Sequence, residues 1–284
     1  MLRKKRHLLC LCLLILIAVF FTGCSSIDQL KVKFGMKNND FEYIKQGKIK
    51  KIVIQNTRDP GFRFIVTDKK AISELYDILS TSKQVQTKST LEPDYVFEMQ
   101  ESSSKVYKFN YITGLDKSEA GNLYNEDKVY VVSKRIDNDI IKSLWNIRKP
   151  KDFSSKYYET IINQVEKYYK ENGAGKTIGI NLYDDVDVAK FILSTDLENF
   201  KTNLNSKVPG AELMSTPKVS EKAKDYDITV GVKTVGYKTF LYKTEITFLD
   251  KKSNTQKKYY IRISDESKDG RWTTKVDTDR PTGW

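Results

Sequence analysis

Apolar residues recur with strand and helix spacing in two regions of this chain, 48–148 and 154–284. The first region is predicted to fold in the order ββαβββα. Asp68 precedes an apolar stripe of helical spacing, so we expect it to cap a helix there. Alternating apolar residues predict strands at 51–54, 62–66, 95–99, 107–111 and 129–132, and a closing helix is expected over 136–145.

The second region begins with helical spacing and ends with alternation. A helix over 157–169 is expected to end at Asn172-Gly173, and a strand follows at 178–182. Asp184 or Asp185 is expected to cap a second helix over 189–204. Four later segments, 228–232, 240–248, 259–263 and 272–276, predict an antiparallel meander.

A polar run around Pro150 separates the two regions, because proline discourages continuation of the preceding helix. Helices and strands that are segregated along the chain indicate an α+β class. The sequence therefore predicts two small α+β domains, each an antiparallel sheet packed with amphipathic helices.

The N-terminus has a different pattern. Basic residues at 3–6 precede fourteen apolar residues at 8–21 and then Thr22-Gly23-Cys24. That order is typical of a secretory signal, and the Cys after Thr-Gly resembles the lipobox of bacterial lipoproteins. A membrane-spanning helix is the alternative, but it needs about 20 apolar residues. We expect residues 1–23 to be removed, Cys24 to carry the lipid, and 24–47 to form a tether that includes a short helix near residues 41–44.

Cleavage at that point would also remove reactive side chains. It deletes His7, the only histidine, together with Cys10 and Cys12. Histidine-dependent triads, Cys-His pairs and ordinary catalytic zinc sites would then be excluded. We expect no catalytic residues, no metal and no cofactor.

Charge changes the picture little. The formal net charge of +12 would fall to about +8, because residues 1–23 hold four Lys and Arg and no Asp or Glu. The remaining lysines alternate with acids and form no run of five like charges beyond the signal, which is typical of a solvated surface. We expect no nucleic-acid partner.

Two motifs invite a sharper interpretation. Residues 173–177, Gly-Ala-Gly-Lys-Thr, resemble a phosphate loop but lack its first glycine and follow a helix, so a turn is favoured. Asp184, Asp185 and Asp187 could bind a hard cation such as Ca²⁺, although helix capping explains acids at that position. Whether this cluster binds a cation stays open.

Two acidic pairs, Asp225/Asp227 and Asp265/Glu266, could supply the carboxylates of a glycosidase, but turn acids are ordinary beside strands. Tyr237, Tyr242 and Trp284 could form an aromatic surface for a glycan or peptide.

The first region resembles the extracytoplasmic domain of YhfM-type lipoproteins from Gram-positive, Bacillus-like bacteria. The resemblance is carried by Phe64-Ile65-Val66-Thr67-Asp68 entering a helix, by Leu91-Glu92-Pro93-Asp94-Tyr95 opening a strand, and by 107–109 and 129–133. It covers about a hundred residues and implies a fold and a location. It implies no catalytic residues.

These observations predict a lipoprotein anchored by Cys24 at the outer face of the cell membrane. We expect it to act as a non-catalytic binding or accessory module for an envelope protein or a wall polymer. The alternative is an exported hydrolase that uses carboxylates on wall glycans.

Overall fold

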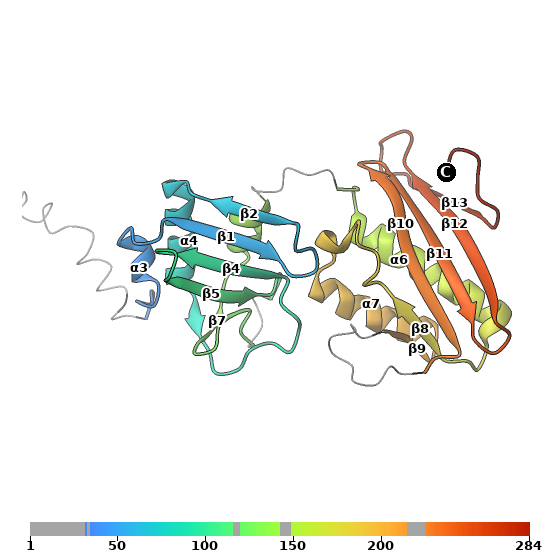
Figure 1. Ribbon diagram of the computed structural model, residues 1–284, viewed down its shortest axis with the longest axis horizontal. Helices are drawn as coiled ribbons and strands as arrows, with labels where there is room; N and C mark the ends of the chain where they lie inside the picture. The colour runs from blue at the N-terminus through green and yellow to red at the C-terminus, as the bar shows by residue number, and fades with distance from the viewer. Residues whose placement is uncertain (1–31, 33–34, 116–119, 143–148, 215–224) are drawn as a thin grey trace, which may run out of the picture.

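The computed structural model describes residue 32 and residues 35–115, 120–142, 149–214 and 225–284. Two domains follow one another along the long axis of the molecule (Figure 1). The predicted signal, Cys24 and residues 25–31, 33 and 34 of the predicted tether lie outside the described residues. Within the described part of the chain, no helix has the length and apolar character needed to cross a membrane.

The first domain contains a seven-stranded sheet in the order β2-β1-β4-β5-β6-β7-β3, in which all neighbouring strands are antiparallel. The sequence predicts its longer strands and misses the two-residue strands β3 and β6. The strands are β1 (Lys51–Asn56), β2 (Arg63–Val66), β3 (Lys83–Gln84), β4 (Tyr95–Gln100), β5 (Val106–Tyr111), β6 (Leu123–Tyr124) and β7 (Val129–Val131).

One face of this sheet forms the first core, with helix α4 (Lys69–Ser80) packed on it. The predicted closing helix is present as a π-helix, Ile136–Ile141, and residues 143–148 lie outside the described part. Helix α3 (Glu42–Lys45) also joins this core, because Phe41 and Ile44 are both buried in it. The folded domain therefore starts before residue 48, inside the stretch predicted to be a tether.

The second domain contains a six-stranded sheet in the order β13-β12-β11-β10-β8-β9. Its last four strands form the predicted antiparallel meander: β10 (Ile228–Lys238), β11 (Leu241–Asp250), β12 (Thr255–Ser264) and β13 (Thr273–Asp277). The other two strands, β8 (Ile178–Asn181) and β9 (Ala211–Leu213), add a parallel edge that the sequence pattern does not predict.

Two helices cover one face of this second sheet and bury the larger apolar cluster. Helix α6 (Phe153–Tyr168) continues into a π-turn, Tyr169–Gly173. Helix α7 (Ser194–Lys207) connects β8 to β9. The α+β class predicted for both domains is confirmed, with sheets packed against helices in each.

The start of α7 corrects one prediction. Residues 189–191 form a short 3-10 turn, Ile192 and Leu193 are extended, and the helix begins only at Ser194. Neither Asp184 nor Asp185 is near enough in sequence to cap it. The apolar spacing over 189–204 is real, but its first part packs as a turn rather than as a helix.

Candidate functional site: the cleft between the domains

Asp94 lies at the end of the first domain that meets the second, just before strand β4. Its side chain is fully buried, and one carboxylate oxygen accepts the Thr113 N–H at 2.9 Å. The other oxygen accepts Arg58 Nη1 at 2.7 Å. Only 10% of the Arg58 side chain is exposed, so this ion pair is largely shielded from water. A shielded pair of this kind has to stay complete, because removing one partner leaves a buried charge.

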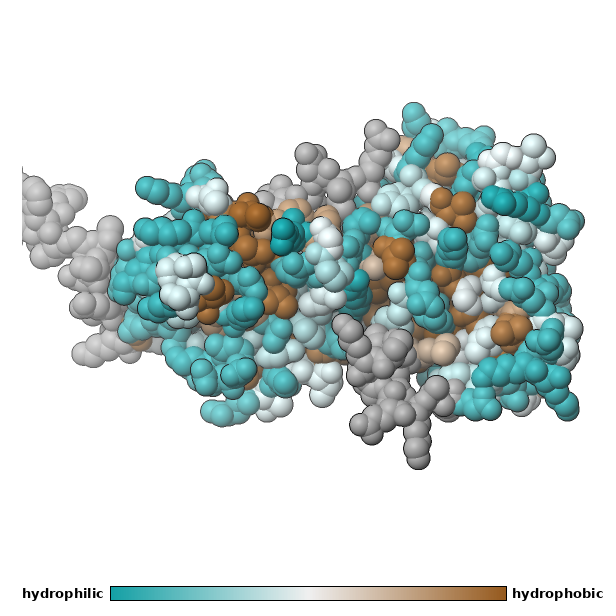
Figure 2. Space-filling view, in the orientation of Figure 1, coloured by the Kyte–Doolittle hydropathy of each residue, from teal (hydrophilic) through white to brown (hydrophobic). Residues whose placement is uncertain are grey.

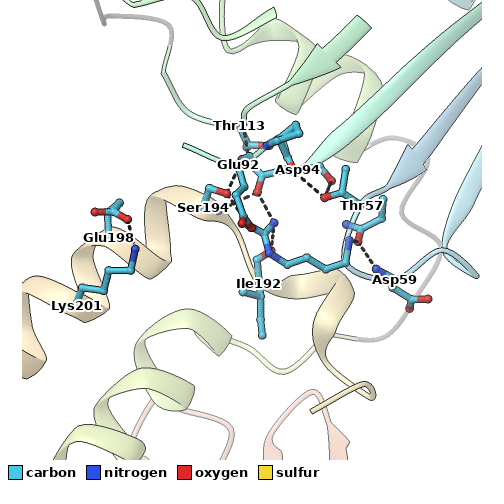
Figure 3. A network of polar contacts seen from close by, with 12 residues as sticks. Thr57, Asp59, Glu92, Asp94, Thr113, Ile192, Ser194, Glu198 and Lys201 are labelled. Atoms are coloured by element: carbon cyan, nitrogen blue, oxygen red, sulfur yellow. Dashed lines mark hydrogen bonds and ion pairs between the residues drawn. The ribbon is translucent and has the colours of Figure 1, made fainter. Parts of the chain in front are cut away.

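The second domain completes this polar cluster. The backbone N–H of Ser194, the first residue of α7, donates to the same Asp94 oxygen at 2.8 Å. Arg58 Nη2 donates to Ser194 Oγ at 2.5 Å, and Ser194 Oγ donates to the Glu92 carbonyl at 2.6 Å. Figure 3 shows Asp94 and Ser194 pointing toward one another across the junction. An aspartate of one domain therefore caps a helix of the other.

A further contact ties the same two loops together. Arg58 Nη1 also lies 3.3 Å from the Ile192 carbonyl, just before α7. Lys190 Nζ lies 3.9 Å from the Asp59 carboxylate (both residues belong to the junction). We call Arg58, Asp94 and Ser194 with these neighbours the inter-domain clamp. Its bonds come from both domains, so the clamp fixes how one domain sits on the other.

Beside the clamp lies a cavity of about 250 Å³ whose walls come from both domains. Charged groups occupy its rim, where Glu92 is half exposed and Glu198 pairs with Lys201 at 2.6 Å. The apolar part of the wall consists of Leu91, Leu197, Leu213 and Met214. An apolar wall with a few polar groups is the usual composition of a small-ligand site. The cleft is therefore able to hold a small amphipathic group.

Several titratable groups near the clamp have shifted pKa values. Burial raises the pKa of Asp137 to about 6, although its carboxylate accepts hydrogen bonds from Tyr111 Oη and the Gly114 N–H. Burial also raises the pKa of Asp196 in the first turn of α7 and lowers that of Lys149. The junction therefore gathers carboxylates that titrate above their usual range.

Asp184 and Asp185, two of the three acids considered for a cation, bind different partners. Asp185 points into the second core, where its oxygens accept from the Thr234 N–H and Oγ1 at 2.8 Å and from Tyr157 Oη at 3.1 Å. Burial raises the pKa of this carboxyl. Asp184 instead pairs with the Asn181 amide at 2.5 Å. Across the described residues, no group of three or more His, Cys, Asp and Glu side chains is arranged to hold a metal ion.

The two acidic pairs lie at opposite ends of strand β11. Asp227 accepts from the Thr177 N–H and hydroxyl next to the Ile228–Asp250 end, and Asp225 pairs with Lys251. The Asp265 N–H donates to Phe240 at the other end. Ten strand residues separate the two positions by about 30 Å. A glycosidase site needs its carboxylates roughly 5 to 10 Å apart, so the two pairs do not combine into one.

The remaining motifs have structural surroundings. Residues 174–177 form a turn between the π-turn and β8, as expected, with Lys176 paired to Asp250. Tyr242 is buried in the second core, which excludes it from an aromatic surface. Trp284 packs against Tyr260 and donates to Glu245 at 3.2 Å, away from Tyr237, whose ring meets Phe191. The three aromatic residues considered for a glycan or peptide surface therefore do not share one surface.

The visible surface is mostly hydrophilic (Figure 2). Figure 2 shows apolar residues as small patches among hydrophilic ones over both domains. Among the residues that the structure describes, the exposed large apolar ones are Met36, Ile65, Val186, Val235, Leu249 and Val276.

Sequence reasoning missed the clamp. Asp94 stands in the motif that carries the family resemblance, yet nothing local indicates that it reaches the second domain. Arg58 follows Asn56 in an ordinary turn, where the Asn56 side chain accepts the Arg58 N–H at 2.9 Å. The sequence holds one indirect indication of the clamp. Leu193 is a poor residue for the N-cap of a helix, so the capping group of α7 has to come from elsewhere.

In the comparison with known proteins, a family match covers the first domain and not the second. Residues 45–150 match the family described as YhfM protein. No curated protein and no solved structure matches the chain. The matched segment contains all seven strands of the first sheet, and it also contains Arg58 and Asp94 of the clamp. Residues 45–150 of this chain are therefore a YhfM-type domain.

Proposed function

We propose that this protein is a lipoprotein of the cell envelope, anchored through Cys24 at the outer face of the membrane. In this proposal it is a non-catalytic binding module, and the cleft between its two domains receives an envelope protein or a wall polymer. The observation that carries the proposal is the cavity of about 250 Å³ beside the clamp, because its walls belong to both domains. A site shared by two domains depends on their orientation, which the clamp fixes.

The anchor is tested by replacing Cys24. We expect Cys24→Ala to move the protein from the membrane fraction to the medium or the soluble fraction, because a lipid-anchored protein has no other stable hold on the bilayer. A Cys24→Ala protein that stays with the membranes contradicts the anchor.

The cleft is tested by site-specific photo-crosslinking in intact cells. A photoreactive amino acid at Leu91, inside the cavity, is expected to give a defined adduct. The same amino acid at Lys252, an exposed turn position outside the cavity, should give none. Absence of the Leu91 adduct, or an equal adduct at Lys252, contradicts binding in the cleft.

Charge reversal on the rim supplies a matched pair of variants. Lys201→Glu places a third acid beside Glu92 and Glu198, and we expect it to weaken the Leu91 adduct several-fold. Lys70→Glu changes the same charge on the exposed surface of α4, far from the cavity. It should leave the adduct unchanged.

A further inference from the structure

A groove on the second domain lies between helix α6 and the edge strand β13, apart from the cleft. Its volume is about 260 Å³. One wall is a single face of α6, formed by Lys156, Glu159, Thr160, Asn163, Gln164 and Lys167. The other wall comes from β12 and β13 and consists of Ile261, Ile263, Trp272, Thr274 and Val276.

The groove lies where the edge strand β13 is less covered than the neighbouring strand β12. Ile261 and Ile263 of β12 are almost fully buried, whereas Val276, directly opposite Ile261, is 43% exposed. The helical wall from Lys156 to Lys167 runs for about 16 Å at 1.5 Å per residue. A linear ligand can therefore lie along it.

Two hydrogen-bond donors in this groove lack acceptors. Gln164 is 4% exposed, and its Nε2 has no partner among the residues that the structure describes. The same holds for Trp272 Nε1, at the start of the opposite wall. Buried polar groups are nearly always hydrogen-bonded, so two unpaired donors in one groove need an explanation. Neither nitrogen has accessible surface in the ligand-free protein, so a bound ligand supplies the missing acceptors only if both side chains turn toward the groove.

The two walls restrict what that ligand is. One wall offers amides, a hydroxyl and charges, and the other offers aliphatic side chains and an indole ring. A pyranose ring has the matching character, because its C–H face packs on apolar and aromatic groups while its rim makes hydrogen bonds. An N-acetyl group adds a carbonyl oxygen, which is the acceptor that the Gln164 and Trp272 donors lack.

We propose that the groove between α6 and β13 binds an N-acetylated saccharide chain, with Trp272 and Gln164 donating to an acetamido carbonyl. This site goes beyond the cleft and shares no lining residue with it. Loss of saccharide binding therefore leaves the cleft proposal standing, and the reverse also holds.

The test uses the purified full chain in detergent micelles, labelled with ¹⁵N-tryptophan. The chain has three tryptophans, so the indole N–H region holds three signals, and Trp272→Phe assigns one of them. Titration with the N-acetylglucosamine trimer is expected to shift the Trp272 signal saturably. The matched glucose trimer with the same β-1,4 linkage carries hydroxyls in place of acetamido groups, and it should bind at least tenfold more weakly.

Variants locate the site. Trp272→Phe keeps an aromatic ring and loses the N–H, and Gln164→Leu keeps the approximate volume and loses the amide. Each is expected to weaken binding of the trimer at least fivefold, as measured by calorimetry, after circular dichroism confirms folding. Trp284→Phe is the control, because Trp284 donates to Glu245 on the opposite face of the sheet. It should bind like the unsubstituted protein.

Three results overturn the proposal. The first is a Trp272 signal in the unsubstituted protein that does not move with the N-acetylated trimer, a result that needs no variant to fold. The second is equal binding of the two trimers. The third is a shift that appears only with an extended peptide of alternating valine and threonine, which would make the groove a peptide site.

Discussion

Helices α4 and α7 begin in different ways. Helix α4 is capped by Asp68, the residue that precedes it, whose carboxylate accepts the Ala71 N–H at 2.9 Å. Helix α7 follows Leu193, which makes no capping hydrogen bond, and its first N–H is bonded by Asp94, 100 residues earlier in the other domain. The cap from Asp68, here called the local cap, stabilises one helix. The cap from Asp94, here called the borrowed cap, also joins two domains.

The surroundings of the two caps determine how much each contributes to the stability of the protein. Asp68 is exposed, so water can replace its hydrogen bond at modest cost. Asp94 is buried with Arg58, and neither group can turn to solvent while the domains stay docked. Breaking the borrowed cap should therefore have a much larger effect than breaking the local one.

The largest effect is expected from Asp94→Ala. It removes the acceptor of the Ser194 and Thr113 N–H groups and leaves the Arg58 guanidinium buried without its carboxylate. We expect a loss of about 3–5 kcal/mol in the free energy of unfolding, measured by urea denaturation. The double variant Asp94→Ala with Arg58→Met should lose less, because it strands no charge. A single variant within 1 kcal/mol of the unsubstituted protein would contradict the clamp.

Asp137, beside the borrowed cap, sharpens the comparison through pH. Burial raises its pKa from 3.8 to about 6, so between about pH 4 and 6 the folded protein holds a proton that the unfolded chain has released. Its contribution to stability is complete below about pH 4 and is lost as the pH rises through 6. We expect Asp137→Asn to have a higher free energy of unfolding than the unsubstituted protein. The difference should grow as the pH rises from 4 to 7 and reach up to about 3 kcal/mol. Parallel stability curves over that range would contradict the raised pKa.

A smaller effect is expected from Asp68→Ala. Loss of an exposed N-cap costs about 1 kcal/mol, and the loss should stay within the first domain. Hydrogen exchange should report faster exchange in the first turn of α4 and no change in α7. Equal destabilisation by Asp68→Ala and Asp94→Ala would show that the two caps do not differ.

The smallest effect is expected from giving α7 its own cap. In the Asp94→Ala background, Leu193→Asn places a capping side chain at the N-cap position and should recover about 0.5–1 kcal/mol in urea denaturation. Asn cannot replace the bond to Arg58, so recovery stays partial. Full recovery would mean that Asp94 acts only as a helix cap and not as a link between domains.

The sequence was informative where the decisive contacts are local. Asp68 and the apolar stripe of α4 lie within a few turns of one another, and helix and cap are both found as predicted. The alternating residues of β10 to β13 likewise predict a meander, because neighbouring strands of a meander are neighbours in sequence. The same reasoning fails at Asp184 and Asp185, which were expected to cap the second helix.

That failure has a physical cause. Asp185 finds better partners in the core, where Thr234 and Tyr157 donate to it, and this position removes it from the helix start. The vacant cap is filled from a distance, and no periodicity along the chain encodes which distant carboxylate arrives there. Strand β9 was missed for a related reason, since three residues pair in parallel only after α7 has returned the chain to β8.

By itself, the sequence determined the α+β class, the separation into two regions, most strands and helices, and the YhfM-type character of the first domain. Those properties follow from hydrophobic periodicity and from motifs whose residues lie close together in the chain. Only the tertiary structure decided that Arg58 and Asp94 meet Ser194, that a cavity forms beside them, and that Gln164 and Trp272 share a groove. Contacts between distant residues depend on how whole elements pack, because burial and complementary shape, rather than local spacing, select them.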